Sequence, residues 1–187
     1  MMAKRSRIQH FKSISWVSSR TFLNLGRLAQ NSELKGNGQQ YVVKKTFHQP
    51  KSVVYNVISN VDKYHEFIPY CEASFINSRD TKGEPTEAGL TVGFKSFDET
   101  FLCTLECQKD KQVIAKSITH SLFHNLLTEW NVTEASSSKT NVELILSYEF
   151  KSDLYNQVSA LFASKVTSIM IKAFEKRAYT EHKQFCK

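Results

Sequence analysis

The chain has 187 residues, a net charge of +7 and a hydrophobic content of 41%, which suits one domain with a sizeable core. Six of its 25 basic residues precede the first acidic residue, Glu33, so the remainder carries 19 basic and 18 acidic residues. A folded part this close to neutral argues against a nucleic-acid-binding face. No apolar run of the sequence approaches the roughly 18 residues that a membrane-spanning helix needs.

The first 35 residues have the composition of a mitochondrial presequence. They are rich in Arg and Ser, and Ile8, Phe11 and Ile14 fall at helical spacing. A secretory signal would need a longer unbroken apolar centre, and a plain basic tail is the remaining alternative. We therefore expect a disordered presequence over residues 1–35, a linker over residues 36–40, and one folded domain over residues 41–187.

The folded part is predicted to begin with one strand and two short helices. Residues 41–48 have the composition of a strand, and Pro50 then opens a helix, because proline suits the first helical turn. A break near Ser59 and Asn60 divides this helix from a second one that reaches about Phe67.

A series of strands follows. The clearest covers residues 142–150, where apolar and polar side chains alternate, so that one face is buried and the other is wet. Short turns between consecutive strands predict an antiparallel sheet. The predicted strands cover residues 71–80, 90–96, 99–108, 111–120, 126–134 and 142–150, and the first two are separated by a turn over residues 81–89.

The chain closes with a predicted helix of about 30 residues, or about 45 Å. Ser152 or Asp153 can cap it. Its apolar stripe matches the apolar face of the sheet, so we expect an α+β fold in which a curved antiparallel sheet of about six to seven strands grips this helix. The stripe consists of Leu154, Val158, Leu161, Phe162, Val166, Ile169, Met170, Ala173 and Phe174.

Catalytic and metal-binding motifs are not found in the sequence. It has no nucleophile elbow, phosphate-binding loop or zinc-binding helix motif. His120, His124 and Glu129 allow an acid–base pair, although a polar turn between two strands is the favoured interpretation. Cys103 and Cys107 would lie about 13 Å apart on a strand, too far for one metal ion. We therefore expect no catalytic residue, metal or cofactor.

Several segments occur in the order typical of one known family. They are FIPYC (Phe67–Cys71), AGLTVGF (Ala88–Phe94), FDETFLC (Phe97–Cys103), SLFHNLLTEW (Ser121–Trp130), and FKSDLYNQVSALF with AFEKRA near the end. Through these segments, residues 41–179 resemble the coenzyme Q-binding family of the START-like (polyketide cyclase/dehydrase and lipid transport) superfamily, and in particular its mitochondrial, fungal-type members. The family usually has Trp where Tyr70 stands.

The resemblance implies a helix-grip fold and a protein that is not an enzyme. It implies binding of ubiquinone in an apolar cavity, and a role as chaperone or carrier of this lipid between its synthesis sites and the respiratory complexes. It also implies peripheral contact with the matrix side of the mitochondrial inner membrane. Two alternatives stay open: a cyclase or hydrolase that uses the same cavity, and a docking subunit of a quinone-biosynthesis complex.

The residues expected to form the site come from the FIPYC loop, the concave face of the sheet and the last helix. Tyr70, Thr128 or Tyr148 is expected to orient the quinone carbonyls. The expected membrane contacts are Phe67, Ile68, Lys172 and Lys176. The expected ligand-binding residues are Phe67, Ile68, Pro69, Tyr70, Leu90, Phe94, Phe101, Trp130, Phe162, Val166 and Met170.

Overall fold

The computed structural model describes residues 38–94 and 97–185, without the side chains of residues 94, 97–98, 154–162 and 185. The predicted presequence lies outside this range, and β1 begins within the predicted linker. The elements are β1 (Gln39–Phe47), α1 (Lys51–Ser59), the 3₁₀ helix η1 (Val61–Glu66), β2 (Cys71–Arg79), β3 (Pro85–Phe94), β4 (Phe97–Gln108), β5 (Gln112–Ser117), β6 (Phe123–Ser136), β7 (Lys139–Phe150) and α2 (Asp153–Phe185).

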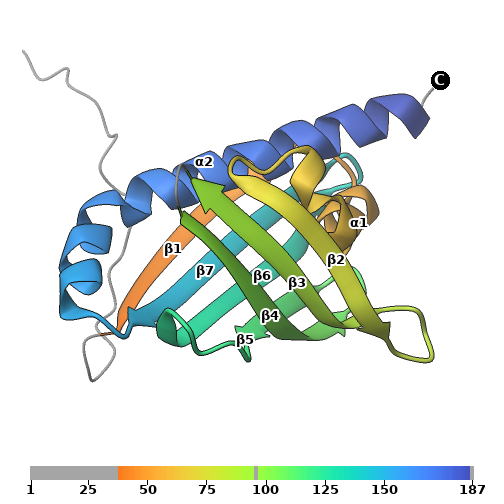
Figure 1. The fold of residues 1–187 in the computed structure, drawn as a ribbon. Helices are drawn as coiled ribbons and strands as arrows, with labels where there is room; N and C mark the ends of the chain where they lie inside the picture. Colours follow the sequence, from red (N-terminus) through yellow and green to blue (C-terminus); the bar gives the residue numbers. More distant parts are fainter. Residues whose placement is uncertain (1–37, 95–96, 186–187) are drawn as a thin grey trace, which may run out of the picture.

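Seven strands form one antiparallel sheet in the order β1-β7-β6-β5-β4-β3-β2. Strands β2 to β7 follow one another as a meander, and β1 pairs with β7. Figure 1 shows α2 running across the curved sheet, with α1 near one end. This architecture confirms the predicted α+β helix-grip fold with two short helices after the first strand.

The turn predicted over residues 81–89 is too long, because β3 already begins at Pro85. One carboxylate oxygen of Asp80 accepts the backbone N–H groups of Lys82 and Glu84 at 2.8 and 2.9 Å, and Gly83 takes a φ of 84°. These bonds complete the turn in a few residues. Pro85 can then stand at the first position of the strand, where a missing N–H is tolerated.

Strand β3 passes close to an aromatic ring of its neighbour. Gly89 pairs with Phe75 across β2 and β3, and a Cβ atom at residue 89 would lie 2.4 Å from the ring carbon Cζ of Phe75. Any larger residue here would force the ring of Phe75 to shift, so glycine allows the close approach of ring and backbone. The other side of Gly89 contributes to the cavity described below.

The face that helix α2 buries agrees only in part with the predicted stripe. Among its described side chains, the buried ones are Ala163, Thr167, Ile171, Phe174 and Ala178, of which Phe174 was predicted. The prediction passed over Thr167, which can be buried because its hydroxyl donates to the Ala163 carbonyl at 2.9 Å.

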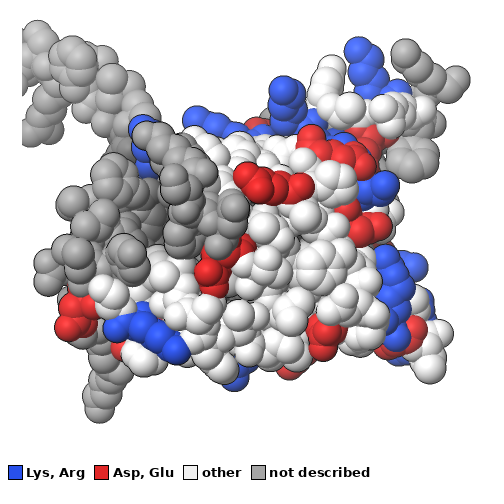
Figure 2. Space-filling model, in the orientation of Figure 1, with Lys and Arg blue, Asp and Glu red and all other residues white. Residues whose placement is uncertain are grey.

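Two side chains of the predicted stripe, Val166 and Ile169, are instead 49% and 39% exposed. Figure 2 shows Lys and Arg side chains along the edge of the molecule formed by α2. Within the described residues, no helix has the length and apolar character needed to cross a bilayer.

Candidate functional site

A cavity of about 970 Å³ lies between the concave face of the sheet and α2. Its volume is at the upper end of the range for small-molecule sites. Strands β3 to β7 form its floor, and η1, the FIPYC loop and α2 close it. Most of its lining is apolar: the residues are Val61, Tyr64, Ile68, Pro69, Tyr70, Cys71, Ala88, Gly89, Leu90, Val92, Phe101, Cys103, Leu105, Val113, Ala115, Leu126, Thr128, Trp130, Leu144, Leu146, Lys165, Val166, Thr167, Ile169, Met170 and Phe174.

Most of the expected ligand-binding residues meet in this cavity. The side chains of Phe94 and Phe162 lie outside the described part of the structure, and Phe67 does not line the cavity. The expected residues that line it are Ile68, Pro69, Tyr70, Leu90, Phe101, Trp130, Val166 and Met170.

Phe67 is partly buried and packs against the core at the C-terminal end of η1. Its ring meets those of Tyr64 and Phe174 edge to face, with centroids 5.7 and 5.1 Å apart. The guanidinium of Arg177 lies over the same ring, 5.5 Å from its centroid. Ile68 is also buried, at 8% exposure. Ile68 therefore faces the interior, and Phe67 is partly buried. The expected contact of these two side chains with a membrane stays a prediction.

Arg177 fastens η1 to α2. Its Nη1 atom lies 2.8 Å from a carboxylate oxygen of Glu66, and its Nε donates to Glu181 at 2.7 Å. The hydrogen bond from Arg177 holds the pKa of Glu66 below its usual range. One wall of the cavity is thus held to the helix that covers it.

The FIPYC loop turns at Pro69 and Tyr70. The N–H of Cys71 donates to the Ile68 carbonyl at 3.2 Å, and Tyr70 has a φ of 66°. Proline followed by a residue with positive φ is the pattern of a type II turn, whose second position favours glycine. Tyr70 holds this unfavourable conformation while its side chain is 59% exposed at the edge of the cavity. Such backbone strain is often found at functional sites.

We expect Tyr70→Gly to be about 1 kcal/mol more stable than Tyr70→Ala, because both remove the side chain but only glycine relieves the left-handed backbone. Urea unfolding of the two variants measures the difference. Equal free energies of unfolding would mean that the turn stores no strain.

Few polar groups of the lining remain available to a ligand. The Tyr64 hydroxyl donates to the Ile58 carbonyl, and the Thr167 hydroxyl donates within α2. Tyr148 donates to Gln39 at 3.0 Å and does not line the cavity. The hydroxyl of Thr128 lies on the floor, and no partner for it is found among the described residues. Of the three expected polar groups, Thr128 and Tyr70 therefore reach the cavity.

Two thiols, those of Cys71 and Cys103, also line the cavity. Burial raises the pKa of the Cys103 thiol to about 11, and it raises the pKa of Cys71 as well. Because the thiolate is the nucleophilic form, both groups are poorly reactive near neutral pH. An electrophilic ligand can lie against them without forming a bond.

The candidate acid–base group does not come together. His120 and His124 are exposed, and the Glu129 carboxylate accepts from Gln112 and Asn131 at 3.0 and 2.9 Å. None of these side chains lines the cavity, and its described lining holds no carboxylate or imidazole. In the described residues, no group of His, Cys, Asp or Glu could hold a metal ion.

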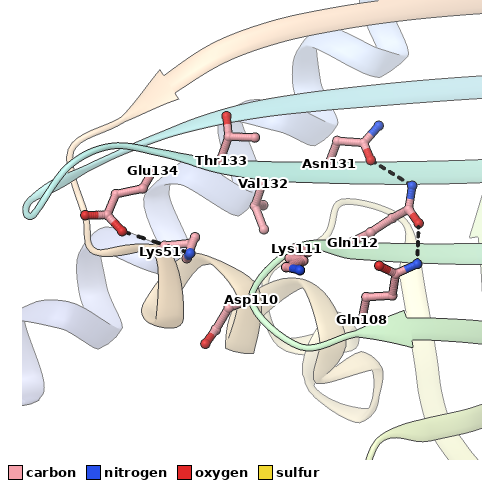
Figure 3. A pocket seen from close by; sticks show the side chains of 9 residues that line it. All are labelled: Lys51, Gln108, Asp110, Lys111, Gln112, Asn131, Val132, Thr133 and Glu134. Carbon is pink, nitrogen blue, oxygen red and sulfur yellow. Dashed lines mark hydrogen bonds and ion pairs between the residues drawn. The ribbon is translucent and has the colours of Figure 1, made fainter.

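A second hollow, of about 430 Å³, is polar. Figure 3 shows several of its side chains pairing with one another: Gln108 donates to Gln112, Gln112 donates to Asn131, and Lys51 approaches Glu134 at 4.0 Å. Asp110 also lines this hollow, and one of its carboxylate oxygens is buried without a hydrogen-bond partner among the described residues. The cavity beneath α2 is larger and apolar, so it is the better candidate site.

The small members of the lining were not predicted. The alternation of the strands places Ala88 and Ala115 on the same face as their bulky neighbours, and that phase could have identified them. Lys165 lines the cavity from α2, and no sequence pattern distinguishes it from the other lysines of that helix.

Comparisons with known proteins agree with this geometry. Residues 48–175 match the family model described as "Polyketide cyclase / dehydrase and lipid transport". The coenzyme Q-binding protein COQ10, mitochondrial, of Eremothecium gossypii is 42% identical over 177 residues, covering 91% of this chain and 84% of that protein. The protein of the same name from Saccharomyces cerevisiae is 43% identical over 147 residues, covering 75% and 71%.

Solved structures share the fold at low sequence identity. A START superfamily protein from Mycobacterium smegmatis matches with a TM-score of 0.68 at 15% identity, covering 75% of this chain and 97% of that one. The Zhui aromatase/cyclase from Streptomyces sp. R1128 matches with a TM-score of 0.66 at 12% identity, covering 76% and 94%.

Proposed function

The chain belongs to the coenzyme Q-binding COQ10 family of the START-like superfamily, and on this basis we propose that it binds ubiquinone in the cavity beneath α2 and carries it for respiratory electron transport. The observation that supports this most is the apolar cavity of about 970 Å³. Each CH₂ group buried there contributes about 0.8 kcal/mol to the free energy of binding. A polyprenyl tail would therefore owe its affinity to the apolar surface area that it buries.

The polar part of the lining suits a quinone head. The Thr128 hydroxyl can donate to a quinone carbonyl, and Tyr70 lies at the edge of the same space. The protonated thiols of Cys71 and Cys103 leave the quinone intact. The described lining carries no acid–base pair. This lining therefore suits a protein that carries the lipid without changing it better than a cyclase or a hydrolase.

The relatives named above are mitochondrial proteins by name. We propose the same compartment for this chain, with residues 1–35 as its presequence and the matrix side of the inner membrane as its place of work. The recipients of the quinone are proposed to be quinone-synthesis or respiratory complexes.

Solvent extraction of the purified full chain tests the proposal. We expect mass spectrometry to find ubiquinone at close to one molecule per protein. Serum albumin purified from the same extract controls for unspecific carry-over of lipid. Protein that carries no quinone, and takes none up from quinone-containing vesicles, would contradict the proposal; other proteins co-purifying without quinone would favour a docking subunit.

A further inference from the structure

The floor of the cavity carries two hydrogen-bond donors. The Thr128 hydroxyl on β6 and the Cys103 thiol on β4 both line the cavity, and no partner for either is found among the described residues. The other thiol of the lining differs, because Cys71 donates to the Ala73 carbonyl at 3.4 Å. A donor inside an apolar cavity gains from a ligand that brings an acceptor to it.

The pairing of the strands fixes how far apart the two donors lie. Thr128 pairs with Ala115 on β5, and Ala115 pairs with Leu105 on β4. Cys103 is therefore two strands and two residues away from Thr128. With strands about 4.8 Å apart and a rise of about 3.3 Å per residue, their Cα atoms are about 12 Å apart.

The part of β5 between the two donors carries only small side chains on the cavity side. Ala115 pairs with Thr128, and Ser117 pairs with Cys103. The Ser117 hydroxyl donates to the Thr119 carbonyl at 3.0 Å, so it is already bonded. Lys116, between these two small residues, is exposed and points to the other face of the sheet. A flat ring can therefore lie on the backbone of β5 at this point.

Two leucines complete the surroundings of this part of β5. Leu105 on β4 pairs with Ala115, and Leu126 on β6 lies two residues from Thr128. Both line the cavity. The four side chains around the ring position thus form two diagonals: the two donors lie on one, and the two leucines lie on the other.

A 1,4-quinone fits the diagonal of the donors. Its two carbonyl oxygens lie on opposite sides of the ring, about 5 Å apart. A hydrogen bond of about 3 Å at each end gives a span of about 11 Å, close to the separation of Thr128 and Cys103. The substituents of the ring then face the two leucines. Burial keeps the Cys103 thiol protonated near neutral pH, so its S–H group is present as a donor.

We propose that the quinone ring lies over β5 between Ala115 and Ser117, with one carbonyl accepting from the Thr128 hydroxyl and the other from the Cys103 thiol. The inference rests on the proposed function, because it specifies how the head of the quinone is held in the same cavity. The site then recognises two oxygens on opposite sides of a ring. An aromatic head with a single oxygen makes at most one of the two bonds.

Infrared difference spectra of the full chain test the contact with Cys103. The ligand used is ubiquinone with two isoprenoid units, and the S–H stretching bands lie in a region free of other protein bands. We expect one S–H band to move to lower wavenumber when this quinone binds, and the movement to be absent in Cys103→Ala. The matched control is Cys71→Ala, which removes a thiol of the same cavity that is bonded to Ala73, and there the movement should persist. S–H bands that stay in place while the quinone binds, or a movement that disappears in Cys71→Ala instead, would overturn the inference and leave the proposed function standing.

Affinities for the same quinone test the contact with Thr128. Trp16 and Trp130 are the two tryptophans of the chain, so with Trp16→Phe the quenching of the cavity residue Trp130 reports binding. We expect Kd to rise about tenfold for Thr128→Val, which keeps the shape but loses the hydroxyl, and to stay within about threefold for Thr128→Ser, which keeps the hydroxyl. Equal Kd values for these two variants would overturn the inference. Absence of binding to the chain with an unchanged cavity would instead contradict the proposed function itself.

Discussion

Replacing Ala115 by phenylalanine is expected to weaken quinone binding about 100-fold while the protein stays folded. Ala115 lies on the cavity floor, opposite Leu105 on β4 and Thr128 on β6. A phenyl ring at this position would project into the space that the ligand needs. If the ring displaces a ligand segment of about four CH₂ groups, the loss is about 3 kcal/mol, or about two orders of magnitude in Kd.

The matched control is Ala135→Phe, which adds the same ring at an exposed position of β6. Circular dichroism and thermal unfolding of both variants should resemble those of the unchanged protein, because the ring at residue 115 can extend into the cavity and the ring at residue 135 faces solvent. A folded Ala115→Phe variant that binds quinone with unchanged affinity would place the ligand somewhere other than this cavity.

Phe174→Ala is expected to cost about 4 kcal/mol in the free energy of unfolding, the largest loss of stability that we predict. Phe174 is 1% exposed. Its ring centroid lies 5.1 Å from those of Tyr64 and Phe67 and 4.5 Å from that of Trp130. Truncation opens a space where η1, α2 and the sheet meet, so the cost includes the cavity left behind as well as the lost apolar contact.

Tyr179→Ala serves as the control on the same helix, because Tyr179 is 57% exposed and its loss should change stability by no more than about 0.5 kcal/mol. Urea unfolding of both variants measures the comparison. Similar losses for the two variants would show that the aromatic cluster around Phe174 does not hold α2 to the sheet.

The strands and the floor of the site could be predicted from the sequence because a strand has a fixed period of two. Once the face carrying Leu144 and Leu146 is assigned to the interior, the buried face of each neighbouring strand follows from the alternation of its own side chains. Trp130 and Phe101 are then expected on the same face of the sheet. The antiparallel arrangement followed from the short turns between consecutive strands, whereas the pairing of β1 with β7 was not predicted.

The rotation of α2 and the direction of the FIPYC side chains could not be predicted. A helix with apolar residues over a broad sector fits several rotations, and the buried Thr167 was not recognised as part of the packed face. In the loop, Tyr70 takes a positive φ and its side chain is 59% exposed, whereas the ring of Phe67 is partly buried. Sequence propensity disfavours this conformation for tyrosine, so it gave no signal.

The pairing of β1 with β7 has a consequence for how the chain folds. Gln40 on β1 donates to Ser147 on β7, 107 residues further along the chain. Each residue pair between β1 and β7 closes a long loop of the chain. Strand β1 therefore has no partner strand until the meander from β2 to β7 is complete. Joining the first strand to the last is therefore expected to be a late and slow step. A chain that stops before β7 would lack both this ladder and one side of the cavity floor.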